Sequence, residues 1–219
     1  MSDNNNSLST KEKLISTGIR LFAKYGFEAT TTRMIADDAG LNLATMSFHF
    51  KSKENFYKEV LEYVSLQIAK TYEPIYSKIQ SLDDKGNLTE EVAWELIDTL
   101  LNLQLSIAVD LPNQEYLMLL YWEQIYRADF MEETPITDVV CIRSESALAL
   151  LLKRYCLNIT DLKASLISRI INGSIVSFGE HPIFIKPFLT QETQSQKQWL
   201  KNEILFFIKS SIQHYCKDL

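Results

Sequence analysis

The order of apolar and polar residues along the chain predicts helices from one end to the other. In residues 10–25, Leu14, Ile15 and Ile19 recur at three- and four-residue spacing, as on the buried face of an α-helix. We expect Thr10 to cap this helix. Beyond residue 52 the same spacing continues, and it predicts helices over about 53–80, 88–109, 113–133, 137–156, 160–178 and 190–217.

The segment 31–50 is the most informative part of the pattern. It reads as a short helix that stops at Gly40, a turn of about three residues, and a second short helix capped by Asn42. Glycine at the turn allows positive φ. Met46 and Phe50 lie one turn apart, so we expect them to hold the second helix against the core. The pattern is that of a helix-turn-helix.

Composition supports an all-α fold. The chain has 219 residues, enough to bury a sizeable core, and only 6 Gly and 5 Pro, too few for a turn-rich all-β protein. The run 183–185 could form a strand, but a single strand cannot build a sheet.

Charge divides the chain into two parts. The net charge of −6 excludes a uniformly basic coat for nucleic acid. Residues 1–60 carry a net charge of +1, however, and the remainder carries −7. This split indicates two parts with different partners, and it leaves room for a local DNA-reading surface near the N-terminus.

Other classes of protein find little support. The three cysteines are few, odd in number and widely spaced, which is typical of buried thiols in a reducing cytosol. The polar N-terminus does not resemble a signal peptide, and the apolar stretch 96–109 is too short and too polar to span a bilayer. We therefore expect a cytoplasmic protein with no membrane partner.

Catalytic and metal-binding patterns are also missing from the sequence. The three histidines, His49, His181 and His214, lie far apart, and no metal-ligand spacing, Gly-rich phosphate loop or nucleophile elbow occurs. We expect no enzyme activity, no cofactor and no metal.

Residues 10–64 resemble the DNA-binding domain of the TetR family of bacterial transcription regulators. The resemblance rests on Leu21-Phe22-Ala23, Gly26-Phe27, Ala29-Thr30-Thr31, Ile35-Ala36, Ala39-Gly40 and the run from Thr45 to Glu54. It covers a quarter of the chain, and the rest is similar to the family only in length and helical character. It implies a helix-turn-helix domain over residues 10–55 and a helical ligand-binding and dimerisation domain over residues 56–219.

The resemblance also implies the residues that contact DNA. Thr32 and Lys53 match phosphate-contacting positions, and the groove-facing set is Ala44, Thr45, Ser47, Phe48 and His49, with Arg33 and Asn42 as further candidates. Ser47 and Phe48 stand where the family commonly has tyrosines, and Leu43 where it often has lysine. We therefore expect fewer phosphate contacts and a shallower dependence of binding on salt.

In the C-terminal part, the helix 88–109 is apolar nearly all round, which predicts a central buried position. Aromatic and polar residues suited to line an effector pocket are Trp94, Tyr116, Trp122 and Arg127. Small and apolar residues suited to a two-fold dimer interface between the last two helices are Gly173, Ser177, Trp199, Ile204, Phe207 and Ile208.

Together these features predict a homodimeric repressor that binds a pseudo-palindromic double-stranded DNA operator and is released by an unknown small-molecule effector. Two alternatives stay open. One is an activator, or a regulator that responds to a protein and has no small-molecule ligand. The other is a helical binding module that has lost DNA binding.

Overall fold

The computed structural model of the chain describes residues 9–110, 113–126, 142–180, 185–191 and 193–217. Within these residues the secondary structure is helical and contains no strand, so the predicted all-α class is confirmed. The elements are α1 (Thr10–Ala29), α2 (Thr32–Asp38), α3 (Leu43–Phe50), α4 (Lys53–Asp84), α5 (Glu90–Val109), α6 (Asn113–Tyr126), α8 (Arg143–Tyr155), α9 (Asp161–Glu180), η2 (Lys186–Phe188) and α11 (Gln194–Lys217).

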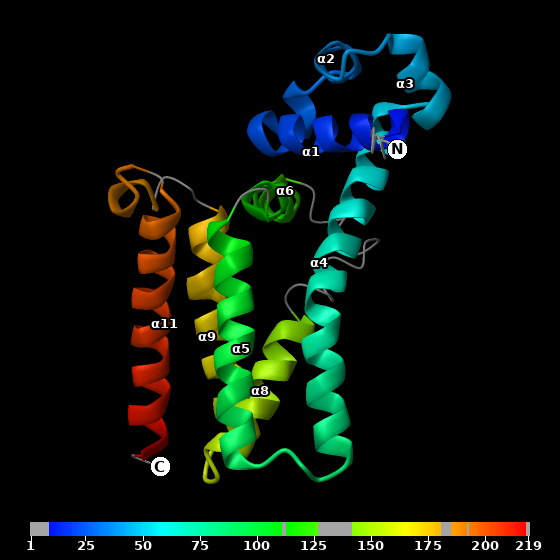
Figure 1. Cartoon of the computed structure of the whole chain (residues 1–219). Coiled ribbons are helices and arrows are strands. Elements are labelled where there is room, and N and C mark those ends of the chain that lie inside the picture. The colour runs from blue at the N-terminus through cyan, green and yellow to red at the C-terminus, as the bar shows by residue number, and fades with distance from the viewer. Residues whose placement is uncertain (1–8, 111–112, 127–141, 181–184, 192, 218–219) are drawn as a thin grey trace, which may run out of the picture.

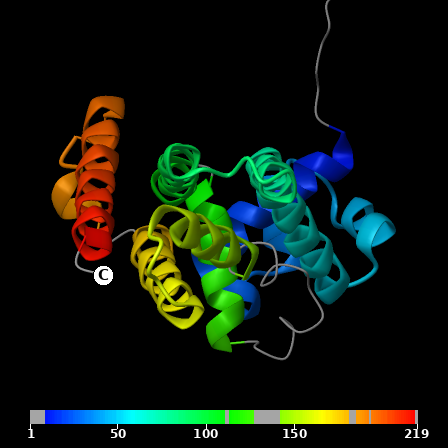
Figure 2. The same cartoon turned by 90° about the horizontal axis from the view of Figure 1, so that it is seen from below.

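The helices form a small N-terminal group and a larger bundle, and α4 connects the two. Figure 1 shows α1, α2 and α3 at one end of the molecule, with α4 leaving them to run the length of the bundle. Helix α6 lies directly beneath α1 and packs against it. Seen from below, α11 stands at the outer side of the bundle, beyond α9 (Figure 2).

Side-chain caps fix where the N-terminal helices begin. The cap of α1 is Ser9 rather than the predicted Thr10: its Oγ accepts a hydrogen bond from Glu12 N at 3.2 Å, and its own N–H donates to Glu12 Oε2 at 2.8 Å. This reciprocal pair is a capping box, which satisfies two helix-terminal donors at once. The predicted cap of α3 is confirmed, because Asn42 Oδ1 accepts from Thr45 N at 2.7 Å.

Helix α5 forms the centre of the bundle, as its apolar sequence predicted. It packs against α4, α6, α8, α9 and α11. By length and composition it could cross a membrane, with a mean hydropathy of 1.3, but its neighbours in the bundle account for its apolar character. One polar side chain joins it to two other helices: buried Gln104 donates through Nε2 to Ser144 Oγ at 2.5 Å and to Asn172 Oδ1 at 3.3 Å.

Within the chain, helices of the bundle approach closely at Gly179. A Cβ on Gly179 would overlap Leu117 Cδ1 and lie 3.1 Å from the carbonyl oxygen of Ala108, so α9 touches both α6 and α5 here. A Cβ on Gly173 would meet no atom of the described chain within 4 Å. The prediction for Gly173 concerns a dimer interface, so its place in the dimer stays a prediction.

Candidate nucleic-acid interface and effector cavities

Helix α3 has one buried face and one exposed face. Met46 and Phe50 are each only 2% exposed and anchor the helix to the N-terminal core, as predicted. Thr45 is half-buried, and the exposed positions are Leu43, Ala44, Ser47, Phe48 and His49. Phe48 is 80% exposed, which is unusual for a ring of this size on a helix that has an apolar core beside it. The outer face is therefore short, largely uncharged and partly apolar.

The polar groups of α3 are organised by local hydrogen bonds. Thr45 Oγ1 donates to Asn42 Oδ1 at 2.8 Å, and Ser47 Oγ donates to the Leu43 carbonyl at 3.1 Å. Because each hydroxyl oxygen also has lone pairs, both side chains keep the capacity to accept a hydrogen bond. Asn42 acts mainly as the cap of the helix. Among the candidates on α3, Ser47 is thus the most accessible hydroxyl.

The residues around α3 hold its angle to the rest of the N-terminal group. Arg20 on α1 makes an ion pair with Asp38 on α2. The Thr30 hydroxyl is buried and donates to the carbonyls of Leu21 at 3.2 Å and Gly26 at 2.8 Å, which closes the end of α1. Gly26 has a φ of +74°, in the left-handed region that favours glycine. These bonds make the junction of α1 and α2 a rigid support.

The phosphate candidates occupy different environments. Lys53, the first residue of α4, directs its ammonium inward: Nζ donates to the carbonyls of Phe27 at 3.0 Å and Thr30 at 3.2 Å. It also lies 4.2 Å from the centroid of the Phe27 ring. Thr32 is half-buried at the start of α2, and Arg33 beside it is exposed. In this structure, Arg33 is the exposed cation of the predicted set and Lys53 is bound to the protein itself.

The three predicted effector residues that the structure describes, Trp94, Tyr116 and Trp122, do not meet in one cavity. Trp94 stacks on Tyr155, with 4.6 Å between ring centroids, and lies on the α11 side of the bundle. Trp122 instead contacts the backbone of α1. Tyr116 is half-buried, and burial, with the nearby Tyr63 and Glu115, raises its phenol pKa. Arg127 lies outside the described residues. Residues close in sequence on α5 and α6 thus face separate parts of the molecule.

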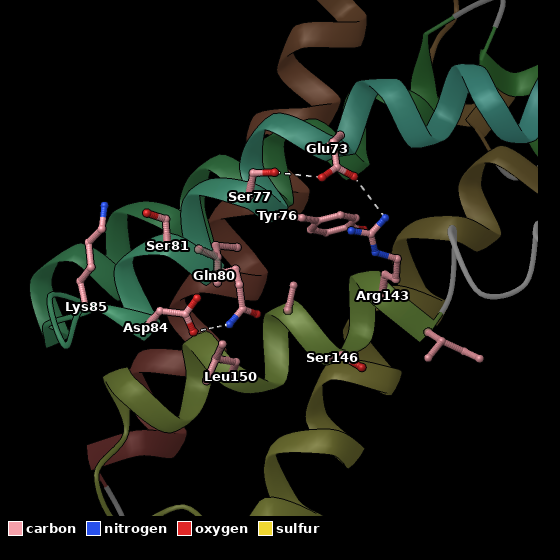
Figure 3. A pocket seen from close by; sticks show the side chains of 13 residues that line it. Glu73, Tyr76, Ser77, Gln80, Ser81, Asp84, Lys85, Arg143, Ser146 and Leu150 are labelled. Carbon is pink, nitrogen blue, oxygen red and sulfur yellow. Dashed lines mark hydrogen bonds and ion pairs between the residues drawn. The ribbon is translucent and has the colours of Figure 1, made fainter.

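A cavity of about 610 Å³ lies between α4 and α8 and was not predicted (Figure 3). We name it the α4–α8 cavity; its lining includes Glu73, Tyr76, Gln80, Arg143 and Ser146. The Arg143 guanidinium lies 4.9 Å from the Tyr76 ring centroid and donates to Glu73 at 3.2 Å. A hydrogen bond from Ser77, together with the Arg143 charge, lowers the pKa of Glu73. These residues belong to two different helices, and Glu73 and Arg143 are 70 positions apart in the sequence. No sequence motif marks them.

A second, larger hollow of about 970 Å³ separates α9 from α11, and we name it the α9–α11 groove. Four of the predicted dimer residues line it, namely Trp199, Ile204, Phe207 and Ile208, whereas Gly173 and Ser177 are not among its lining residues. Trp199 is 49% exposed and Phe207 is 72% exposed. On its other side α11 is tied to α5, where Lys201 Nζ lies 2.9 Å from Asp110 Oδ2.

Comparison with known proteins agrees with this geometry. A family profile described as bacterial regulatory proteins, tetR family, matches residues 14–60. The uncharacterized HTH-type transcriptional regulator YerO of Bacillus subtilis (strain 168) is 49% identical over 53 residues, 24% of this chain and 18% of that protein. The HTH-type transcriptional repressor KstR2 of Mycolicibacterium smegmatis is 43% identical over 53 residues, 24% of this chain and 26% of that protein. The matched residues thus span about a quarter or less of these relatives.

The whole chain also shares its fold with solved structures. A TetR-like transcriptional regulator from Rhodococcus sp. RHA1 superposes with a TM-score of 0.64 at 16% identity, covering 94% of this chain and 97% of that one. Likeness at this identity concerns the fold. The resemblance predicted from the sequence is confirmed, and the relatives are regulators of transcription, in agreement with the prediction that the chain is not an enzyme.

Proposed function

We propose that this chain, whose N-terminal domain belongs to the tetR family of bacterial regulatory proteins, is a transcription regulator that binds DNA as a homodimer and is released by an effector. The proposal rests on the division of α3 into a buried face and an exposed face. Its inner face is fixed by Met46 and Phe50, and its exposed outer face is available to enter a major groove. The relative KstR2 is a transcriptional repressor, which favours repression over activation.

In the proposed complex α3 reads base edges and the surrounding residues hold the phosphates. Ala44 and Phe48 would contact thymine methyl groups, while Thr45, Ser47 and His49 would bond base edges or phosphates. Arg33 and Thr32 would bind the backbone at the start of α2. Because its ammonium is directed inward, Lys53 would act through its main-chain N–H in the first turn of α4, where the helix dipole favours an anion.

Dimerisation is proposed through α9 and α11. The α9–α11 groove is lined mostly by apolar side chains, and Trp199 and Phe207 stand exposed at it, as at many protein interaction sites. A second copy related by a two-fold axis would bury it. Two α3 helices would then face half-sites about one helical turn apart on a pseudo-palindromic operator, in the cytoplasm.

Release is proposed to act on α4, the helix that carries the N-terminal group. An unknown small-molecule effector in the α4–α8 cavity would bind better to one position of α4 than to another, and so shift the spacing of the two α3 helices. By linkage, DNA would weaken effector binding by the same factor. We place the change of domain near residues 55–56, within α4, so a shift of this helix reaches both parts.

The test is binding to DNA from upstream of the gene, measured by fluorescence anisotropy in a salt series against scrambled DNA of the same composition. We expect two protomers per site and clear preference for the natural sequence. Ser47→Glu should abolish this preference, because it places a negative charge on the groove-facing side of α3. Thr71→Glu, which adds the same charge at an exposed site on α4, is the control. Equal weak binding to both DNAs by the unchanged protein would contradict the proposal.

A further inference from the structure

Helices α3 and α4 are joined by two residues, Lys51 and Ser52. Helix α3 ends at Phe50 and α4 begins at Lys53. The Lys51 N–H donates to the Ser47 carbonyl at 3.1 Å, which continues the helical bonding of α3 by one residue. The Ser52 N–H then donates to the Phe50 carbonyl at 2.7 Å, and this bond between residues i and i+2 closes a γ-turn centred on Lys51. The connection between α3 and α4 is therefore very tight.

Lys51 adopts a backbone conformation that is rare for a residue with a side chain. Its φ is +63° and its ψ is −44°. This ψ lies outside the left-handed helical region as well, and a γ-turn of this hand is strained. Among the residues that the structure describes, the other positive φ angles all belong to glycines, namely Gly26, Gly40 and Gly86. Glycine would adopt this turn at little steric cost, so the turn by itself does not account for a lysine.

Packing on both sides of the turn maintains the strained conformation. Phe50 is 2% exposed and Phe56 is fully buried, and their ring centroids lie 4.6 Å apart in an edge-to-face arrangement. Ser52 Oγ accepts from Asn55 N at 3.1 Å and so caps α4. The two helices are thus fixed immediately before and after Lys51, and their ends impose the turn on it. Strain that the surrounding structure holds in this way is concentrated at functional sites.

Lys51 carries a charge at the end of the exposed face of α3. It is exposed and follows Ser47 by four positions, about one helical turn, so it lies beyond Ser47 on the same side of the helix. Its ammonium makes no ion pair within the residues that the structure describes. Such an ammonium can bind an anion without first breaking a contact within the protein.

Other cations of the N-terminal group are engaged with the protein itself. Lys11 and Arg20 make ion pairs with carboxylates of α4 and α2, respectively. Lys53 donates to main-chain carbonyls at the end of α1. Lys51, by contrast, has an exposed charge at the end of α3, as Arg33 has at the start of α2. The two exposed cations thus belong to the two helices of the helix-turn-helix.

We propose that Lys51 is a phosphate-binding residue of the DNA interface, held beside the exposed face of α3 by the strained turn. The assignment rests on the proposed function. The Lys51 ammonium and the main-chain N–H of Lys53 would bind the DNA backbone next to the bases that α3 reads. The fold gives up some stability at this turn, and the interface gains one positive charge on each protomer.

Two substitutions separate the charge from the backbone strain. Lys51→Gln removes the charge and keeps a side chain at positive φ, whereas Lys51→Gly removes both the charge and the strain. We expect both variants to bind DNA more weakly and to reduce the slope of log affinity against log salt by about 1 for each protomer. Lys51→Gly should unfold at a higher urea concentration than Lys51→Gln, because glycine adopts the turn without steric cost.

Two further variants are controls. Lys51→Arg keeps the charge and should retain the salt slope of the unchanged protein. Lys78→Gln removes the same charge from an exposed site on the part of α4 that lies in the bundle, and it should leave the slope nearly unchanged. Fluorescence anisotropy in a salt series gives the slope, on DNA from upstream of the gene and on scrambled DNA. Urea unfolding followed by circular dichroism gives the stability of each variant.

Equal salt slopes for Lys51→Gln and Lys78→Gln would overturn the phosphate contact. A urea midpoint for Lys51→Gly at or below that of Lys51→Gln would overturn the strain. If the unchanged protein prefers the natural DNA but Lys51→Gln keeps its slope, the assignment of Lys51 fails alone. If Lys51→Gln lowers the slope but no DNA is preferred, the contact stands and sequence-specific regulation fails. A chain that binds neither DNA would overturn both.

Discussion

The indole Nε1 of Trp122 donates a hydrogen bond of 3.0 Å to the main-chain carbonyl of Ala23, a residue 99 positions earlier in the chain. The indole ring also lies 3.7 Å from where a Cβ on Gly26 would stand. This contact fastens α6 to the end of α1. The N-terminal group is therefore held by two routes, through α4 by chain connectivity and through α6 by packing.

Trp122→Phe tests the second route. The variant keeps an aromatic ring but leaves the Ala23 carbonyl without this donor, and we expect the free energy of unfolding to fall by about 1 to 3 kcal/mol. Urea unfolding followed by circular dichroism measures it. Trp94→Phe is the matched control, because the Trp94 ring is stacked on Tyr155 and the same change keeps that stacking. Equal losses in the two variants would contradict the role given to the hydrogen bond.

Phe206 and Phe207 offer a matched pair for the dimer. They are neighbours on α11 and are 73% and 72% exposed, yet only Phe207 lines the α9–α11 groove, while Phe206 lies on the Trp94 side. We expect Phe207→Glu to raise the dimer dissociation constant by about 100-fold or more, since it buries a charge in an apolar interface. Phe206→Glu should leave it nearly unchanged. Sedimentation equilibrium measures the dimer dissociation constant of each variant. Similar effects of both variants would argue against the groove as the interface.

We expect substitution of Lys53 to lower the stability of the fold and substitution of Arg33 to lower the affinity for DNA. Lys53→Ala removes two hydrogen bonds from a charged, half-buried group to the end of α1, so we expect the free energy of unfolding to fall by about 1–3 kcal/mol. Arg33→Ala should leave stability nearly unchanged, because the side chain is exposed. It should instead weaken binding to all DNA sequences alike and reduce the salt slope by about 1. A large loss of stability in Arg33→Ala would refute this division.

Gly179 and Gly173 lie on the same helix, and we expect substitution by alanine to change the free energy of unfolding in opposite directions at the two positions. Gly179→Ala forces a methyl group into Leu117 and the Ala108 backbone, and we expect a loss of about 1–3 kcal/mol in the free energy of unfolding. Gly173→Ala meets no described atom within 4 Å and replaces glycine inside a helix, so we expect a gain of up to about 1 kcal/mol. Thermal unfolding at one protein concentration compares them; a loss in both would show that Gly173 is covered in solution.

Cys216 predicts how stability depends on alkaline pH. Burial, and then the neighbouring Cys156 thiol, raises the pKa of Cys216 from 9.0 to about 12. The neutral thiol is therefore favoured in the folded chain, and its contribution to stability is complete below pH 9 and lost as the pH rises from 9 through about 12. The difference in unfolding free energy between the unchanged protein and Cys216→Ala should shrink over this interval. A constant difference would contradict the shift.

The sequence predicted correctly several features that depend on residues a few positions apart in the chain. Asn42 caps α3 and Met46 and Phe50 anchor it, because a cap and a helical stripe depend on residues three or four positions apart. The same reasoning missed the start of α1 by one residue. Ser9 and Glu12 form a capping box, and its signature was present in the sequence.

Contacts between segments far apart in the sequence could not be predicted from the local pattern of apolar and polar residues. Trp94 and Trp122 both satisfied the compositional description of a pocket residue, but one packs beside α8 and α11 and the other on α1. Their surroundings depend on how the helices cross, which is set by side-chain packing along their whole length. For the same reason Tyr76 and Arg143, which meet across the α4–α8 cavity, carried no sequence signal.

The sequence by itself determined the helical class, the helix-turn-helix and its inward anchors, because helix periodicity and capping are local properties of the chain. Only the tertiary structure decided where α6 touches α1, which apolar face of α11 stays open, and that Tyr57 and Glu123, 66 positions apart, share a hydrogen bond. Those outcomes arise from packing between residues tens of positions apart, where many different arrangements satisfy the same pattern of apolar and polar positions.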